Sequence, residues 1–191
     1  MTANPVEQQK ISTVEDLIAM PDDGKRYELI NGEIVEVGTA NRKHTILGTW
    51  LLGTLFVYLS TNKIGGQMGG PDGTYRLDAA NTRVPDISYL MPASAARIPA
   101  GSVYCPFAPD LAVEIKSPSN TPGEMRKLAR LYIRSGSKLV WTISYEDKIA
   151  HVYRPGQLAV ELDEDDELDG DDVLPGFTVK LADLFAQIEG V

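Results

Sequence analysis

RVPDISYL at residues 83–90 and DLAVEIK at residues 110–116 are the two stretches that decide how the chain folds. The first is predicted to be a strand with Pro85 near its start, where a missing backbone N–H is tolerated. The second is a short apolar run, typical of a buried strand. Together they carry the pattern P-D…E-x-K at Asp86, Glu114 and Lys116.

This pattern combines the residue types that metal-dependent phosphodiester hydrolysis requires. Glu114 and Lys116 would share a face, because side chains two residues apart on a strand point the same way. If the two strands are neighbours, Asp86 and Glu114 approach closely enough to hold one divalent ion through carboxylate oxygens. The attacking water needs activation, and the leaving oxygen needs its charge offset. A strand-end acid beside an ordinary Glu–Lys pair is the alternative interpretation.

The segments around these strands predict the fold class. We expect an α/β (α+β) domain with a restriction-endonuclease-like mixed central sheet flanked by helices, and with an added N-terminal β-hairpin. Asn31-Gly32 between two alternating runs is a strong hairpin signal. A disordered N-terminus over residues 1–10 is expected to precede a single domain over residues 11–191. The predicted helices cover residues 13–20, 44–60, 122–134 and 181–188; the predicted strands cover 26–30, 33–37, 75–77, 83–90, 110–115, 138–144, 149–154 and 157–162.

The composition is that of a soluble globular protein, with 191 residues, 43% of them hydrophobic and 24% charged. Its apolar runs are shorter than the roughly 18–20 residues that cross a bilayer. The N-terminus has no basic-then-apolar signal pattern. Cys105 is the only cysteine, which rules out an intrachain disulfide. These features favour a cytoplasmic location.

The net charge of −9 is concentrated in one segment, ELDEDDELDGDD at residues 161–172. Without its nine acids, the remaining 18 acids balance the 18 Lys and Arg residues. A neutral body does not predict strong non-specific DNA binding, but it leaves room for a local basic groove. The segment fails as an EF-hand loop, because a frame starting at Asp165 puts Gly176 where a bidentate Glu is required. A solvated turn between strands is the expected structure.

Several further motifs occur together with the P-D…E-x-K pattern. In chain order they are YELINGE at 27–33, His44 opening the long helix, RVPD at 83–86, VEIKSPS at 113–119, the helix that includes Tyr132, KLVW at 138–141, VYRPG at 152–156 and LPGF at 174–177. Over residues 12–188 this order resembles that of the Uma-type restriction endonuclease family, which belongs to the PD-(D/E)XK nuclease superfamily. The resemblance implies a restriction-endonuclease-like fold, DNA as the substrate, and Mg²⁺ as the cofactor with Mn²⁺ as a substitute.

Carried over by position, the resemblance makes Asp86 and Glu114 the metal carboxylates. Lys116 would orient the attacking water or stabilise charge in the transition state. A further acid usually completes such a site, and Glu28 and Glu33 are both candidates, because the hairpin places them on one face. His44 is a candidate metal ligand or phosphate contact. For Glu28, Glu33 and His44 a purely structural or exposed role remains open.

The chain departs from its relatives in the helix that follows. Relatives often carry a Lys four residues before the helix tyrosine, where this chain has Leu128. Lys127 is displaced by one residue, which rotates its side chain by about 100° around the helix. We therefore expect Lys127 to point away from the site and Lys116 to supply the positive charge.

Three functions stay open on the sequence alone. The leading one is a Mg²⁺-dependent DNA endonuclease, and cutting both strands would require a homodimer. The second is a catalytically weak or inactive module of the same fold that binds nucleic acid or protein. The third is a nuclease acting on RNA or on a small phosphodiester. A serine hydrolase is disfavoured, because neither Ser117 nor Ser119 lies in a G-x-S-x-G turn.

Overall fold

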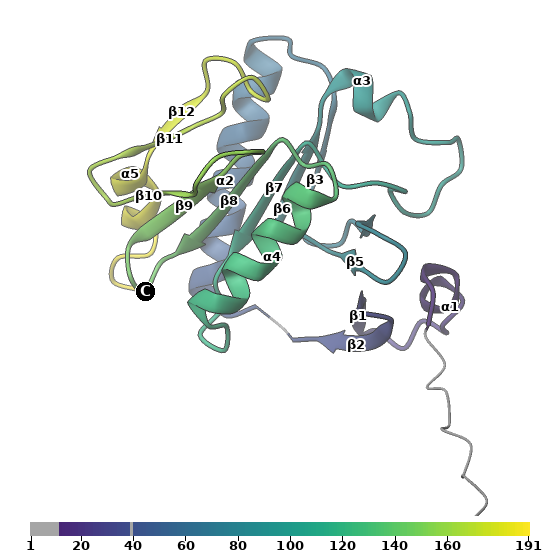
Figure 1. Cartoon of the computed structure of the whole chain (residues 1–191). Coiled ribbons are helices and arrows are strands. Elements are labelled where there is room, and N and C mark those ends of the chain that lie inside the picture. The colour runs from purple at the N-terminus through teal and green to yellow at the C-terminus, as the bar shows by residue number, and fades with distance from the viewer. Residues whose placement is uncertain (1–11, 39) are drawn as a thin grey trace, which may run out of the picture.

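The computed structural model describes residues 12–38 and 40–191, so the predicted disordered segment 1–10 lies outside the described residues. Helices are interspersed among runs of strands along the chain (Figure 1). The helices are α1 (Val14–Ile18), α2 (Arg42–Thr61), α3 (Pro92–Ala95), α4 (Pro122–Arg134) and α5 (Leu181–Ala186). The strands are β1 (Arg26–Ile30), β2 (Glu33–Val37), β3 (Gln67–Gly69), β4 (Tyr75–Arg76), β5 (Thr82–Arg83), β6 (Ile87–Leu90), β7 (Leu111–Ile115), β8 (Leu139–Ser144), β9 (Ile149–Tyr153), β10 (Val160–Leu162), β11 (Glu167–Asp169) and β12 (Thr178–Lys180).

A six-stranded mixed sheet in the order β10-β9-β8-β7-β6-β3 forms the centre of the molecule. Strands β7 and β8 are parallel and are joined through α4, whereas the other neighbours are antiparallel. Figure 1 shows α4 in front of this sheet and α2 behind it. Val113 packs in the core cluster that includes Leu51 of α2, whereas Ala112 packs in the cluster that includes Tyr132 of α4. The predicted mixed sheet with helices on both faces is confirmed.

The two stretches that carry the P-D…E-x-K pattern lie side by side. Strands β6 and β7 pair with Ile87 opposite Val113, so Asp86 stands at the start of β6 beside the end of β7. The predicted strand 83–90 is wrong in one respect, because it is two strands separated at Val84-Pro85-Asp86. Pro85 lacks the N–H that a continuous ladder needs. Because the ladder is broken there, the Asp86 carboxylate can point at the end of the neighbouring strand β7.

The hairpin β1–β2 forms as predicted, with Ile30 opposite Glu33. Asn31 and Gly32 both have positive φ, 52° and 80°, as a two-residue hairpin turn requires. The hairpin is fastened to β5 rather than to the central sheet. The Leu29 N–H donates to Thr82 Oγ1 at 2.9 Å, and Arg83 Nη1 donates to the Leu29 carbonyl at 2.8 Å.

Arg83→Met is expected to lower the free energy of unfolding by about 2–4 kcal/mol, because it leaves buried polar groups unpaired. Arg83 is buried, donates to the Leu29 and Thr82 carbonyls, and has its Nε 3.6 Å from Glu28 Oε2. Urea unfolding followed by circular dichroism measures the effect. Arg76→Met on neighbouring β4 is the matched control; equal midpoints for the two variants would contradict the role assigned to Arg83.

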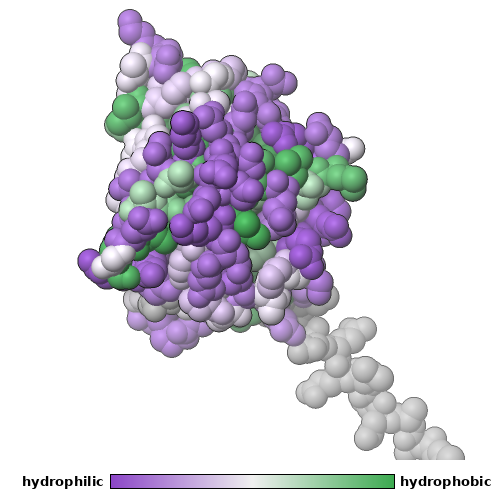
Figure 2. Space-filling view, turned by 90° about the vertical axis from the view of Figure 1, so that its left-hand side faces the viewer, coloured by the Kyte–Doolittle hydropathy of each residue, from purple (hydrophilic) through white to green (hydrophobic). Residues whose placement is uncertain are grey.

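The acidic segment differs from the predicted turn. Four residues of the segment, 163–166, do form a turn, in which the Asp163 N–H donates to Asp166 Oδ2 at 3.0 Å. The residues that follow instead form β11, which pairs with β12 because Leu168 is fully buried in the main core. Figure 2, which views the side that carries β10, β11, β12 and α5, shows a mostly hydrophilic surface with small, separate hydrophobic groups.

The helices of the described residues include none that combines the length and the apolar character needed to cross a membrane. Cys105 is a buried free thiol.

Candidate active site

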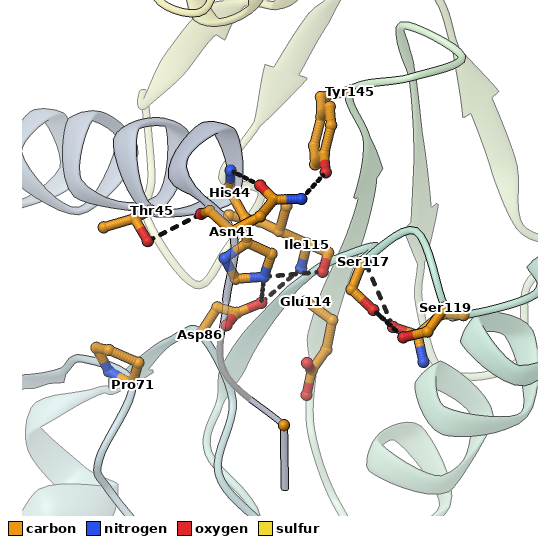
Figure 3. Close-up of polar contacts among 12 residues, drawn as sticks. Asn41, His44, Thr45, Pro71, Asp86, Glu114, Ile115, Ser117, Ser119 and Tyr145 are labelled. Atoms are coloured by element: carbon orange, nitrogen blue, oxygen red, sulfur yellow. Dashed lines mark hydrogen bonds and ion pairs between the residues drawn. The ribbon is translucent and has the colours of Figure 1, made fainter. Parts of the chain in front are cut away.

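Asp86 lies at the junction of three elements. Its Oδ2 accepts a hydrogen bond from the Ile115 N–H at 2.7 Å, which ties the start of β6 to the end of β7. His44 Nε2, from the first turn of α2, lies 3.1 Å from the same oxygen. Figure 3 shows the carboxylate held between the imidazole and the Ile115 backbone. The position of Asp86 is therefore fixed by β7 and α2.

His44 is held by its own helix and by β7. Asn41 caps α2 through its Oδ1, which accepts the His44 N–H at 3.0 Å, and its Nδ2 donates to Tyr145 Oη at 2.7 Å. His44 Nε2 lies 3.1 Å from the Ile115 carbonyl oxygen as well as from Asp86. Both neighbours are acceptors, so Nε2 carries a hydrogen. Burial alone would lower the pKa of His44, but the hydrogen bond and charge of Asp86, together with the hydrogen bond to the Ile115 carbonyl, outweigh it and raise that pKa.

Glu114 projects from β7 toward α4. Its Oε1 accepts a hydrogen bond from the buried Tyr132 hydroxyl at 2.7 Å. Burial, followed by the charge of Asp86, raises the pKa of Glu114 well above its ordinary value, and Glu28 adds to the effect. The Tyr132 hydroxyl keeps its proton, because burial and the Glu114 charge raise its pKa as well. Tyr132 is thus a fixed donor that orients Glu114.

Glu28 reaches the same region from the hairpin. Its Oε1 accepts the Val84 N–H at 2.8 Å. Burial raises the pKa of Glu28, against the opposing charge of Arg83 and the Val84 hydrogen bond. The charge of Asp86 raises it further, and that of Arg26 lowers it. Glu28 and Asp86 are therefore electrostatic neighbours that come from different parts of the chain.

These side chains line one cavity of about 480 Å³. Four of the predicted site residues are in its wall: Glu28, His44, Asp86 and Glu114. The other described residues of the wall are Arg26, Val37, Gly38, Ala40, Asn41, Val84, Ile115, Ser117, Pro118, Ser119, Asn120 and Leu128. The volume suits a phosphate group with part of its nucleotide, within the usual range of ligand pockets.

Lys116 and Glu33 are not brought to this cavity. Lys116 Nζ donates to Glu146 Oε2 at 2.9 Å and lines a separate space of about 30 Å³ beside Met125 of α4. Thr142, the register partner of Glu114, lines that space too, so Lys116 and Glu114 share a sheet face but not a cavity. Glu33 shares the hairpin face of Glu28, but it is exposed beside the turn and is not among the described lining residues.

Three residues in or behind the wall were missed or left without a role by the sequence analysis. Arg26 stands two residues before Glu28 on β1, so the period of two that placed Glu28 also places Arg26. Asn41 is a helix cap, and Tyr132 orients Glu114. Leu128 lines the cavity, whereas Lys127 is exposed and is not among its described residues, as the one-residue shift predicted.

The donor set suits a hard divalent cation. Asp86, Glu114, Glu28 and the Ile115 carbonyl offer oxygen atoms, which Mg²⁺, Mn²⁺ and Ca²⁺ prefer. Among residues 12–38 and 40–191, however, no three His, Cys, Asp or Glu side chains are gathered closely enough to hold an ion. His44 occupies both Asp86 Oδ2 and the Ile115 oxygen. The ligand types therefore fit, and binding would require His44 or the acids to shift.

Comparisons with known proteins give one family and one fold. A family model described as "Uma2: Putative restriction endonuclease" matches residues 14–182. The crystal structure of a putative nuclease belonging to DUF820 from Anabaena variabilis ATCC 29413 is similar, with a TM-score of 0.80. The sequences are 20% identical, and the match covers 92% of this chain and 98% of that one. At this identity the likeness is one of fold. No curated protein matches the chain.

Proposed function

The chain belongs to the Uma2 family of putative restriction endonucleases, and from this premise we propose that it is a Mg²⁺-dependent endonuclease that hydrolyses DNA phosphodiester bonds in the cavity lined by Asp86, Glu114 and Glu28. Mn²⁺ would substitute for Mg²⁺. A homodimer would supply the second site that cutting both strands requires. The proposed setting is the cytoplasm, where Cys105 would stay reduced.

The observation that carries the proposal is that three carboxylates from distant parts of the chain face one cavity, although they stand too far apart to hold an ion without a shift. Glu28 comes from β1, Asp86 from the start of β6 and Glu114 from β7, and all three line one cavity. Burial raises the pKa of Glu28 and of Glu114, with a further rise from Asp86. Keeping like charges together in a partly buried place is unfavourable unless a cation offsets them. A divalent ion would supply that charge.

Two of the proposed ligands are held in place by a neighbouring side chain. Asp86 and Glu114 would hold the ion, with Glu28 as the third acid and the Ile115 carbonyl as a further oxygen. The ion would offset negative charge on the phosphate and on the leaving oxygen. His44 positions Asp86 through Nε2–H, and Tyr132 positions Glu114 through its hydroxyl. Lys116 would have to leave Glu146 before it could orient water or stabilise charge.

That Lys116–Glu146 contact favours a second candidate function. With its lysine paired elsewhere, the same fold would serve as a catalytically weak or inactive module that binds nucleic acid or protein. The two candidates share the acidic cavity and differ in turnover.

Nicking of supercoiled plasmid by the purified full chain, with Mg²⁺ or Mn²⁺ and with EDTA as the control, tests the proposal. Metal-dependent conversion to nicked and then linear DNA supports an endonuclease. DNA binding without conversion in either metal supports the binding module. An RNA duplex of the same sequence, incubated in parallel, tests whether the substrate is DNA or RNA. Conversion that persists in EDTA would sink the metal-dependent mechanism.

Glu28→Gln is expected to reduce nicking by about 10–100-fold, whereas Glu33→Gln leaves it unchanged. Gln keeps an oxygen that can accept the Val84 N–H but removes the charge from the cavity. Glu33 shares the hairpin face of Glu28 and is exposed, which makes it the matched control. Initial nicking rates at several Mg²⁺ concentrations measure the effect. A larger loss for Glu33→Gln would assign the third acid to Glu33 instead.

A further inference from the structure

The cavity of the proposed nuclease has few positive side chains among its described lining residues. Its described wall holds three carboxylates, and Arg26 is the one Lys or Arg among the residues that line it. A phosphodiester carries negative charge. Carboxylates that line a cavity of this size lie close enough to a bound phosphate to repel it. Lys116 offers no help in this arrangement, because its ammonium is paired with Glu146 beside a different space.

Arg26 is fixed in place by groups that leave its charge uncancelled. Nη1 donates to the Pro71 carbonyl at 2.9 Å, and Nη2 lies 3.3 Å from the Gly38 carbonyl. The nearest carboxylate, Asp72, is 3.8 Å away on a side chain that is 85% exposed, so solvent screens that pair. A guanidinium has five N–H donors, and two contacts to carbonyls leave others for a ligand.

The position of Arg26 on the hairpin directs it to the same place as Glu28. The two residues are separated by one position on β1 and therefore share a face. Val37, the register partner of Arg26 on β2, lines the cavity as well. The Arg26 charge also acts on both Glu28 and His44. Arg26 thus presents a preoriented positive charge at the acidic site.

We propose that Arg26 binds a non-bridging phosphate oxygen of the substrate strand, so that the hairpin β1–β2 forms part of the nucleic-acid-binding surface. The inference rests on the proposed function and names a residue for its substrate contact. An Arg is suited to this task because its planar fork matches the geometry of phosphate oxygens.

Two variants that each remove one positive charge test the inference. Arg26→Gln removes the proposed contact. Lys25→Gln changes the adjacent residue, whose exposed Nζ pairs with Glu36 at 2.7 Å and which points to the other face of β1. Binding of a short duplex DNA is measured by fluorescence anisotropy with Ca²⁺ in place of Mg²⁺, over a series of KCl concentrations. Mn²⁺ affinity without DNA and the melting temperature are measured for each protein.

For Arg26→Gln we expect Kd to rise about tenfold and the slope of log K against log[salt] to shrink by about 1. Lys25→Gln should change neither quantity. Arg26→Lys keeps the charge and should retain the salt slope with a smaller rise in Kd. Mn²⁺ affinity should not fall in any of the three, because Arg26 contacts the phosphate and not the ion.

The possible results distinguish a failure of the Arg26 assignment from a failure of the proposed nuclease function. If the wild type binds and nicks DNA but Arg26→Gln matches it in Kd and salt slope, the assignment of Arg26 alone is overturned. Loss of Mn²⁺ affinity in Arg26→Gln would also overturn it, because the residue would then be supporting the acids. If the wild type neither binds nor nicks DNA, the proposed function fails and the inference fails with it.

Discussion

Asp86→Asn is expected to reduce plasmid nicking by about 10³-fold or more, equivalent to about 4 kcal/mol of transition-state stabilisation. Asp86 is the acid that β6, β7 and α2 all position, through its contacts with the Ile115 N–H and His44 Nε2. Asn keeps one oxygen to accept the Ile115 N–H, so the strand ends stay tied. It removes the negative charge on which divalent-ion binding depends.

Nicking rates in Mg²⁺ and Mn²⁺, together with Mn²⁺ affinity, measure the effect of Asp86→Asn. Asp183→Asn makes the same chemical change at an exposed position in α5 and should behave as wild type. Because Asp86 helps to raise the pKa of His44, that pKa should fall in Asp86→Asn, which NMR titration detects independently of activity. Retained nicking by a folded Asp86→Asn protein would remove this cavity as the site of hydrolysis.

The local parts of the fold were predictable because their signals are local. Asn31-Gly32 specified the hairpin turn and its register, since a two-residue turn leaves one pairing. Thr121 and Glu124 mark the start of α4 in the sequence, and in the structure they form a capping box. The pairing of β6 with β7 was only a condition of the predicted metal site, because neither strand alone specifies its neighbour; the structure supplies it.

The side-chain partners were predictable only in part. The alternation of a strand correctly placed Glu114 and Lys116 on one sheet face, but a long Lys side chain can reach several partners from one backbone position. Glu146, in the turn after β8, supplies the partner that Lys116 takes. Arg26 was missed because the Pro71 and Gly38 carbonyls that fix it are backbone atoms without a sequence signature. Strand β11 was missed because charge surrounds its one buried residue, Leu168.

Glu114→Gln is expected to abolish most nicking, by about 10²–10³-fold, and at the same time to stabilise the metal-free protein. Gln still accepts the Tyr132 hydroxyl hydrogen bond through its oxygen, so the orientation of the side chain survives. The charge that is lost is one that burial and Asp86 make unfavourable. Removing it should raise the free energy of unfolding at neutral pH by about 1–2 kcal/mol, or roughly 2–8 °C in Tm.

The pH dependence of stability follows from the same residue. The folded protein holds a proton on Glu114 at pH values where the unfolded chain, with an ordinary value near 4.5, releases it. The metal-free wild type therefore loses stability as pH rises from about 4.5 through the raised pKa of Glu114, and Glu28 acts in the same direction. Glu114→Gln should flatten this part of the profile, whereas Glu33→Gln, which changes an exposed acid, should leave it as in the wild type.

Divalent metal should reverse the order of stability of the wild type and Glu114→Gln, so that the wild type becomes the more stable protein. An ion that binds the folded state stabilises it by mass action, so Mn²⁺ should raise the Tm of the wild type and restore its stability at high pH. Glu114→Gln lacks one of the proposed ligands and should gain much less. Thermal unfolding between pH 5 and 9, with Mn²⁺ or EDTA, measures both effects. If Glu114→Gln is less stable than the wild type in EDTA, Glu114 is a structural partner of Tyr132. Its negative charge would then not destabilise the metal-free protein, and a metal would have no such destabilisation to relieve.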